Sequence, residues 1–191
     1  MPRRLGMERQ NGLGAPGVDL HTSIIELIDL RSFSNLWFWI MLALLWSSAS
    51  HWVLGIPYDL VLRARRRGGQ HEADLEDMVR INVGRLLYIS RTSGLAMLSF
   101  GCFVLSSLAV VGFYYRYEFA QAVFLILFPM SVVGLLSLST ARALEVEELD
   151  RETLYKRLAR HRIYVQLIGM LSIFVTSLWG MYQNFQLSPL N

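Results

Sequence analysis

The chain has 191 residues, of which 53% are hydrophobic and only 17% are charged, with a formal net charge of +3. Soluble domains carry about 25% charged residues, so the composition favours one compact membrane unit and gives no indication of nucleic-acid binding. The only cysteine, Cys102, excludes an internal disulfide, an iron–sulfur cluster held by this chain alone and a thiolate metal site.

Two segments are expected to precede the membrane part, which we assign to residues 35–183. Residues 1–18 are rich in glycine and polar residues without periodicity, which predicts a disordered tail. Residues 19–34 alternate apolar side chains with Glu26 and Asp29, which predicts an amphipathic helix in the membrane interface. A turn docked on the bundle is the alternative.

The first membrane span is predicted over residues 36–56, because one crossing takes about 20 apolar residues. Trp37 and Trp52 lie near its ends, as in aromatic belts. Small side chains and one histidine recur every four residues, at Ala43, Ser47, His51 and Gly55. This face is expected to point into the bundle, since small residues let helices approach closely. Pro57 is expected to kink or end the helix.

A polar loop over residues 57–92 follows. Its arginine cluster is expected to set the topology and is a candidate for binding lipid head groups: Arg63, Arg65, Arg66 and Arg67. Gly68–Gly69 predicts a turn, and a helix is expected to restart near His71. One face of this helix shows a heptad pattern, with positions spaced four and three apart and the polar Asn82 among apolar residues: Leu75, Val79, Asn82, Leu86, Ile89 and Ser93. Asn82 either fixes register or partner number, or is an exposed residue at a helix edge.

Two further spans are predicted over residues 93–115 and 119–138, because Arg116 and Glu118 are the only charged residues between Ser93 and Thr140. The turn between these spans is expected at residues 115–118. Pro129 is expected to bend the third span.

A second polar, helical loop is predicted over residues 139–162, a fourth span over 163–182 and a tail over 184–191. The heptad pattern recurs from the loop into the span, at Leu154, Leu158, His161, Val165, Ile168 and Ser172. The acidic residues of both loops are expected to form solvated helix faces, those of the second loop pairing with Arg151, Lys156 and Arg160.

Basic residues gather beside the same ends of the spans. Both long loops are rich in arginine, whereas only Arg116 lies between the second and third spans and the tail carries no charge. Basic residues mark the cytoplasmic side of a membrane. Both loops are therefore expected in the cytoplasm, and both termini in the periplasm, of a bacterial inner membrane.

Two histidines are the candidate cofactor ligands. His51 and His161 are predicted at similar depth on the first and fourth helices, where they could ligate a b-type haem or a metal. A hydrogen bond to serine or to a carbonyl is the ordinary alternative. The chain lacks a phosphate-binding glycine loop and the sequence motifs of hydrolases. It also lacks Asp, Glu, Lys and Arg within the spans, which disfavours proton-coupled transport.

Residues 24–66, IIELIDLRSFSNLWFWIMLALLWSSASHWVLGIPYDLVLRARR, resemble the start of an alphaproteobacterial integral membrane protein family. Members of this family are sometimes labelled "component of SufBCD complex", the iron–sulfur cluster assembly machinery. The resemblance implies a membrane partner of that machinery. It assigns no catalytic residue to this chain.

Together these features predict an all-α, integral membrane four-helix bundle with helical cytoplasmic extensions. The expected function is non-enzymatic: a scaffold or assembly partner that contacts another protein, or a second copy, through its cytoplasmic hairpins. The residues expected to make this contact, or to pack the hairpins internally, are Leu75, Val79, Asn82, Leu86, Leu154, Leu158 and His161. The alternative is a subunit of a transporter or redox complex, with haem on His51 and His161. The scaffold itself needs no cofactor or small-molecule substrate.

Overall fold

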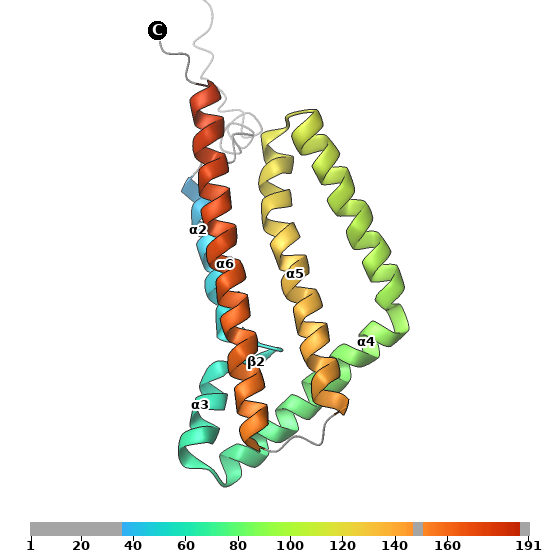
Figure 1. Ribbon diagram of the computed structural model, residues 1–191, viewed down its shortest axis with the longest axis vertical. Helices are drawn as coiled ribbons and strands as arrows, with labels where there is room; N and C mark the ends of the chain where they lie inside the picture. Colours follow the sequence, from blue (N-terminus) through green and yellow to red (C-terminus); the bar gives the residue numbers. More distant parts are fainter. Residues whose placement is uncertain (1–35, 147–150, 188–191) are drawn as a thin grey trace, which may run out of the picture. The chain divides into compact units, whose positions relative to one another are not determined.

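The computed structural model describes residues 36–146 and 151–187 (Figure 1). The predicted tail 1–18 and the predicted interfacial helix 19–34 lie outside these residues. The described part confirms the all-α expectation apart from one short hairpin. Its elements are α2 (Leu36–His51), β1 (Trp52–Val53), β2 (Ile56–Pro57), α3 (Tyr58–Arg67), α4 (Gln70–Ala109), the π-helical turn η2 (Val110–Tyr114), α5 (Glu118–Val146) and α6 (Arg151–Leu187).

The first predicted span is shorter than expected. α2 ends at His51 after 16 residues, which span about 24 Å, and does not continue to Ile56. The chain instead forms an antiparallel hairpin in which Trp52 pairs with Pro57. Its two turn residues, Leu54 and Gly55, have φ values of 51° and 76°. Two consecutive positive φ values are typical of a tight hairpin turn and cannot continue a right-handed helix.

α4 joins a polar region and an apolar one in one helix of 40 residues. It begins at Gln70, next to the expected restart at His71, after Gly68 and Gly69 adopt φ values of 63° and 59°. Figure 1 shows that α4 changes direction partway along its length, so that its second half rises to η2 beside α5. Residues 115–117 then lead into α5.

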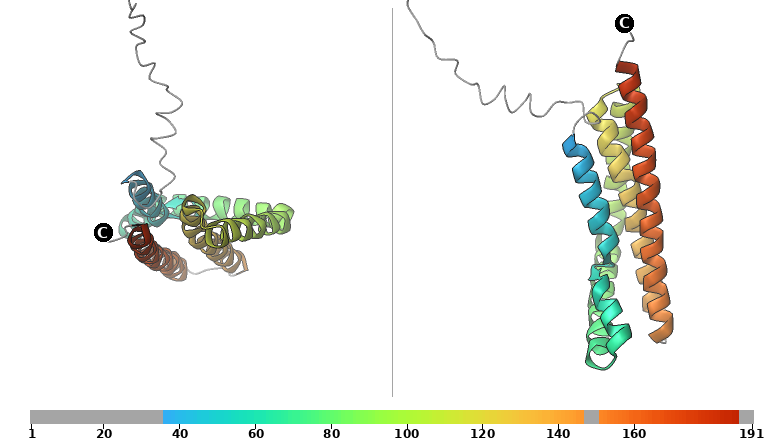
Figure 2. Two further views of the ribbon diagram at one scale, coloured as in Figure 1. Left: turned by 90° about the horizontal axis from the view of Figure 1, so that it is seen from above. Right: turned by 90° about the vertical axis from the view of Figure 1, so that its left-hand side faces the viewer.

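The helices follow one another in space in the order α2, α6, α5 and the second half of α4. α6 packs against both α2 and α5, and α5 packs against α4. Seen from above, α2 and the second half of α4 lie at opposite sides of the α5–α6 pair (Figure 2). α6 continues to Leu187, so residues 184–187 of the predicted tail are helical. Within residues 36–146 and 151–187, three helices are long and apolar enough to cross a membrane: α4 with η2, α5 and α6.

The main hydrophobic core lies in the charged part of the chain. We call this part the polar end: the hairpin and α3, residues 70–92 of α4, 139–146 of α5 and 151–162 of α6. Its buried core residues are Val53, Ile56, Val61, Ala64, Leu75, Val79, Val83, Leu87, Ala141 and Leu158. In the most apolar 18-residue stretch of each long helix, 0% of the residues are buried in α4, 6% in α5 and 28% in α6. Most of the buried apolar residues among those described thus lie where the sequence is charged, whereas the most apolar parts of α4, α5 and α6 are mostly exposed or half-buried.

Candidate functional site

The polar end is the best-packed region, and α4 enters it through one face. Its buried residues recur strictly every four positions, at Leu75, Val79, Val83 and Leu87. The predicted four–three heptad pattern therefore holds only for the first two of them. Asn82 and Leu86 are half-buried, whereas Ile89 and Ser93 are exposed. A four-residue repeat winds slowly around a helix of 3.6 residues per turn, so α4 crosses its neighbours obliquely instead of forming a coiled coil with them.

The corresponding pattern on α6 lies inside the chain. Leu158, His161, Val165 and Ser172 are buried, and Leu154 and Ile168 are half-buried. Leu75 and Leu158 are both 0% exposed and belong to the same core. The buried residues of this pattern therefore pack within the chain.

Ion pairs connect the helices around this core. Arg151 at the start of α6 lies 3.0 Å from a carboxylate oxygen of Glu72 and 3.5 Å from one of Glu76, both on α4. Arg91 of α4 lies 2.7 Å from Glu145 of α5. Arg151 thus pairs across to α4, and within the second loop Lys156 pairs with Glu152 at 2.7 Å, as expected for the acids of that loop. Because these arginines are exposed, each ion pair contributes less than about 1 kcal/mol to stability. The pairs between helices mainly fix the register of α4 against α5 and α6.

Glu152 and Tyr155 on α6 have shifted pKa values. A hydrogen bond from Lys156, at 2.7 Å, lowers the pKa of Glu152. Burial, and then the charge of Glu72, raises the pKa of Tyr155. Both shifts favour the charge states that these groups have at neutral pH, an ionised Glu152 and a neutral Tyr155.

The hairpin contacts α4, and the first residue of α3 contacts α6. Nδ2 of Asn82 lies 3.5 Å from the carbonyl oxygen of Gly55, at the long limit of a hydrogen bond. The guanidinium of Arg162 lies over the ring of Tyr58, 4.0 Å from its centroid, which is a cation–π contact. Asn82 thus faces the turn of the hairpin within its own chain. The arginine cluster on α3 lies outside this core, with all its members exposed: Arg63, Arg65, Arg66 and Arg67.

The small-residue face predicted on the first helix does not point inward. Ala43, Ser47, His51 and Gly55 are all exposed. The buried residues of α2 are Leu42 and Trp46, and the indole of Trp46 packs over Gly169 of α6. The close approach is therefore made by a large residue of α2 over a glycine of α6, and the face with the small residues is left outside.

The two candidate haem ligands have different surroundings. His51 is exposed at the end of α2, with its ring edge-to-face with Trp52. His161 is 3% exposed, and its nitrogens face two hydroxyls of α5: Nδ1 lies 3.0 Å from Oγ1 of Thr140 and Nε2 lies 3.5 Å from Oγ of Ser137. The Thr140 hydroxyl donates to the carbonyl of Leu136, so Nδ1–H donates to Thr140. His161 therefore joins α6 to α5 as a packed hydrogen-bonding residue.

A second buried polar centre lies at the opposite end of the helices and was not predicted. Gln121 of α5 is 2% exposed. Its Nε2 donates to the carbonyl oxygen of Gly112, 2.8 Å away, and its Oε1 accepts from Nε1 of Trp179, 2.9 Å away, and from Nε2 of Gln183. The only signal in the sequence is that Gln121 is the one amide side chain between residues 119 and 138.

The described residues offer little that resembles an active site. Among them, no group of three or more His, Cys, Asp or Glu side chains could hold a metal ion. A cavity of about 400 Å³ at the polar end is lined by Glu76, Arg80 and Glu145 together with apolar residues. Cys102 is exposed on the apolar part of α4. No protein-family model matches the chain, and no curated protein or solved structure matches it either.

Proposed function

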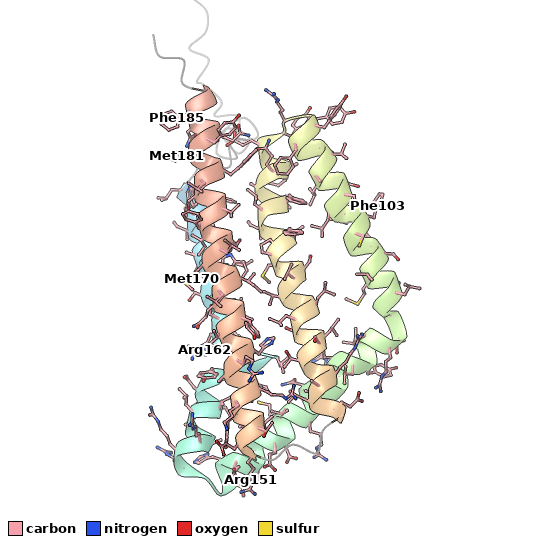
Figure 3. The ribbon with its side chains drawn as sticks, in the orientation of Figure 1. Phe103, Arg151, Arg162, Met170, Met181 and Phe185 are labelled. Atoms are coloured by element: carbon pink, nitrogen blue, oxygen red, sulfur yellow. The ribbon has the colours of Figure 1, made fainter. Side chains whose placement is uncertain are left out.

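We propose that this chain is a multi-pass protein of the bacterial inner membrane and a non-enzymatic scaffold whose polar end docks another protein in the cytoplasm. The observation that carries this proposal is the reversed distribution of apolar residues. Large apolar side chains stand outward along the helices, as Phe103 on α4 and Met170 and Phe185 on α6 do in Figure 3. In water such a continuous surface would aggregate, whereas the hydrocarbon of a bilayer would cover it.

The proposed topology has four crossings. α4 with η2, α5 and α6 are long enough to cross, and α2 runs beside α6. α2 is shorter than the bilayer core, which is about 30 Å thick, but local thinning of the bilayer accommodates such a mismatch at small energy. The polar end faces the cytoplasm because it holds most of the arginines, whereas Arg116 is the only basic residue near the turn at 115–117.

The scaffold role follows from what remains exposed at the polar end. Most apolar residues of the two heptad patterns are buried or half-buried within the chain, and Ile89 is exposed. A partner would therefore meet mainly charged side chains. On α3 and the start of α4, the exposed charged residues include Arg63, Arg65, Arg66, Arg67, Asp74 and Asp77. Ion pairs and a packed core hold this surface in one conformation, which lowers the entropy lost on binding. The resemblance of residues 24–66 makes the iron–sulfur cluster assembly machinery the first partner to test.

Cysteine accessibility tests the topology. In a Cys102→Ser background, single cysteines replace Leu36, Arg66 or Arg116, each at an exposed position. A membrane-impermeant maleimide should label the Leu36→Cys and Arg116→Cys variants in cells with a permeabilised outer membrane, and the Arg66→Cys variant only after lysis. Labelling of the Arg66→Cys variant before lysis would show that the orientation is opposite to the proposed one. If the Leu36→Cys variant were protected from labelling before lysis, α2 would not cross the membrane.

Site-specific photo-crosslinking tests the scaffold role. A photoreactive residue at Arg66 should give a discrete crosslink to a second protein in living cells. The same residue at Phe103, which is 69% exposed on the apolar part of α4, should give crosslinks to lipid only. If neither position crosslinks to protein while the chain is membrane-bound and folded, the scaffold role is wrong.

A further inference from the structure

A cavity of about 210 Å³ lies between α5 and α6 where the charged part of α6 meets its apolar part. Two facing stripes line it, each following the spacing of one helix face. The stripe on α6 consists of Arg157, Arg160, His161 and Tyr164, and that on α5 includes Ser139 and Thr140.

The lining of this cavity is cationic and rich in hydrogen-bonding groups. Of the described residues that line it, none is acidic, and two are arginines. Oγ1 of Thr140 and Nδ1 of His161 are hydrogen-bonded at 3.0 Å, and these two residues form the inner wall of the cavity. Arg157 is half-buried and Arg160 is exposed. Paired guanidiniums with nearby hydroxyls are the groups that recognise phosphate oxygens.

The depth of the cavity is the second observation. Exposed apolar side chains begin directly beside it: Ile163 and Leu167 on α6 are 53% and 51% exposed, and Leu135 on α5 is 55% exposed. On the other side α5 continues to the exposed Arg142. The cavity therefore lies at the boundary between the apolar and charged surfaces, where a bilayer holds its phosphate groups. Tyr164 fits the same depth, since tyrosine favours this interface.

We infer that this cavity binds the phosphate of an anionic phospholipid head group. Arg157 and Arg160 contact the phosphate oxygens, Tyr164 and Ser139 complete the hydrogen bonds, and the acyl chains lie along the exposed apolar residues of α5 and α6. The inference rests on the proposed membrane insertion, because only then does a lipid phosphate reach this depth. Basic pockets between spanning helices on the cytoplasmic side are suited to anionic lipids. The site is distinct from the arginine cluster of α3.

Lipid titration of the purified full chain in a neutral detergent tests the inference. The probes are phosphatidylglycerol and phosphatidylcholine with identical acyl chains, and native mass spectrometry measures the lipid retained. The wild type should retain phosphatidylglycerol preferentially. R157Q/R160Q should lose at least about fivefold in affinity for each arginine removed. R66Q/R67Q removes the same charge from the end of α3 and should retain the preference. If both double variants lost affinity for phosphatidylglycerol equally, net charge alone would explain the effect, and the proposed site would be wrong.

Two additional measurements distinguish a misfolded variant and a free phosphate ion from a lipid site. R160Q alone changes an exposed residue, so it tests the site even if R157Q/R160Q fails to fold, and an unchanged preference in R160Q would overturn the inference. Inorganic phosphate that displaces phosphatidylglycerol at millimolar concentration would identify a free phosphate ion as the ligand and overturn the lipid assignment.

Extraction with alkaline carbonate tests the proposed function separately from the lipid site. A chain that stays in the membrane without a lipid preference refutes only this inference. A chain that is extracted refutes the proposed function as well, because the cavity would then not lie at the depth of lipid phosphates.

Discussion

Gly169 on α6 and Trp46 on α2 bring two apolar helices of this chain close together. A Cβ atom on Gly169 would lie 2.7 Å from Cε3 of the Trp46 ring, which is inside van der Waals contact. Trp46 is 3% exposed, the least of the large aromatic residues on α2. Since α2 is short, this one contact does much to fix its position against α6.

Gly169→Ala should therefore destabilise the fold. The added methyl must displace an indole ring that is packed on its other side, and such overpacking costs about 1–3 kcal/mol. The thermal unfolding midpoint in detergent, followed by tryptophan fluorescence, should fall.

Gly134→Ala on α5 is the matched control for this change. A Cβ atom there meets no heavy atom within 4 Å, and alanine favours the helix by up to about 1 kcal/mol over glycine. Its midpoint should stay the same or rise. A fall of equal size in both variants would contradict the close packing of α2 on α6.

At the scale of elements, Gln121 connects three of them at the end opposite to the polar end. Its amide bridges the carbonyl of Gly112 in η2 with two donors of α6, Trp179 and Gln183. A Cβ atom on Gly112 would lie 2.9 Å from the backbone nitrogen of Gln121, so the turn packs closely on α5. This network keeps η2, α5 and α6 together where the core of the polar end does not reach.

Gln121→Leu should lower stability by about 1–3 kcal/mol, because it leaves a carbonyl and two donors without their partner in a buried site. Gln183→Leu removes one donor from a half-buried position and should lower stability by less than about 1 kcal/mol. The midpoint of thermal unfolding distinguishes the two variants. Equal effects would mean that Gln121 does not organise this end.

At the scale of the whole molecule, the proposed membrane insertion places two exposed apolar residues of α4 in different solvents. Phe103 is 69% exposed and Ile81 is 64% exposed. If water surrounded all of α4, replacing either residue with arginine would be nearly neutral. If a bilayer surrounds the second half, arginine at Phe103 costs about 2.5–3.5 kcal/mol on insertion.

Phe103→Arg should therefore reduce the amount of chain recovered in the membrane fraction, and Ile81→Arg should leave it unchanged. Quantitative immunoblotting of carbonate-washed membranes measures both. Because the two substitutions add the same charge to the same helix at similar exposure, equal recovery would count against a bilayer around the second half of α4.

Some features of the fold could be predicted from the sequence because they depend on neighbouring residues alone. The turn at Gly68–Gly69 and the return of the chain at residues 115–117 lie where the sequence predicts them, since glycine and a short charged break act locally. The predicted end of α2 is wrong. The hairpin there is stabilised by the burial of Val53 and Ile56 in the core and by Asn82, which is distant in sequence.

The sequence by itself determined which lengths of chain are apolar and which are charged, because each side chain has its own preference for water or hydrocarbon. Only the tertiary structure decided which face of each helix is buried. An apolar helix is hydrophobic on all sides, so periodicity cannot select between the Ala43 face of α2 and the Trp46 face. The shape of the neighbouring helix makes that choice, as Gly169 of α6 makes room for Trp46.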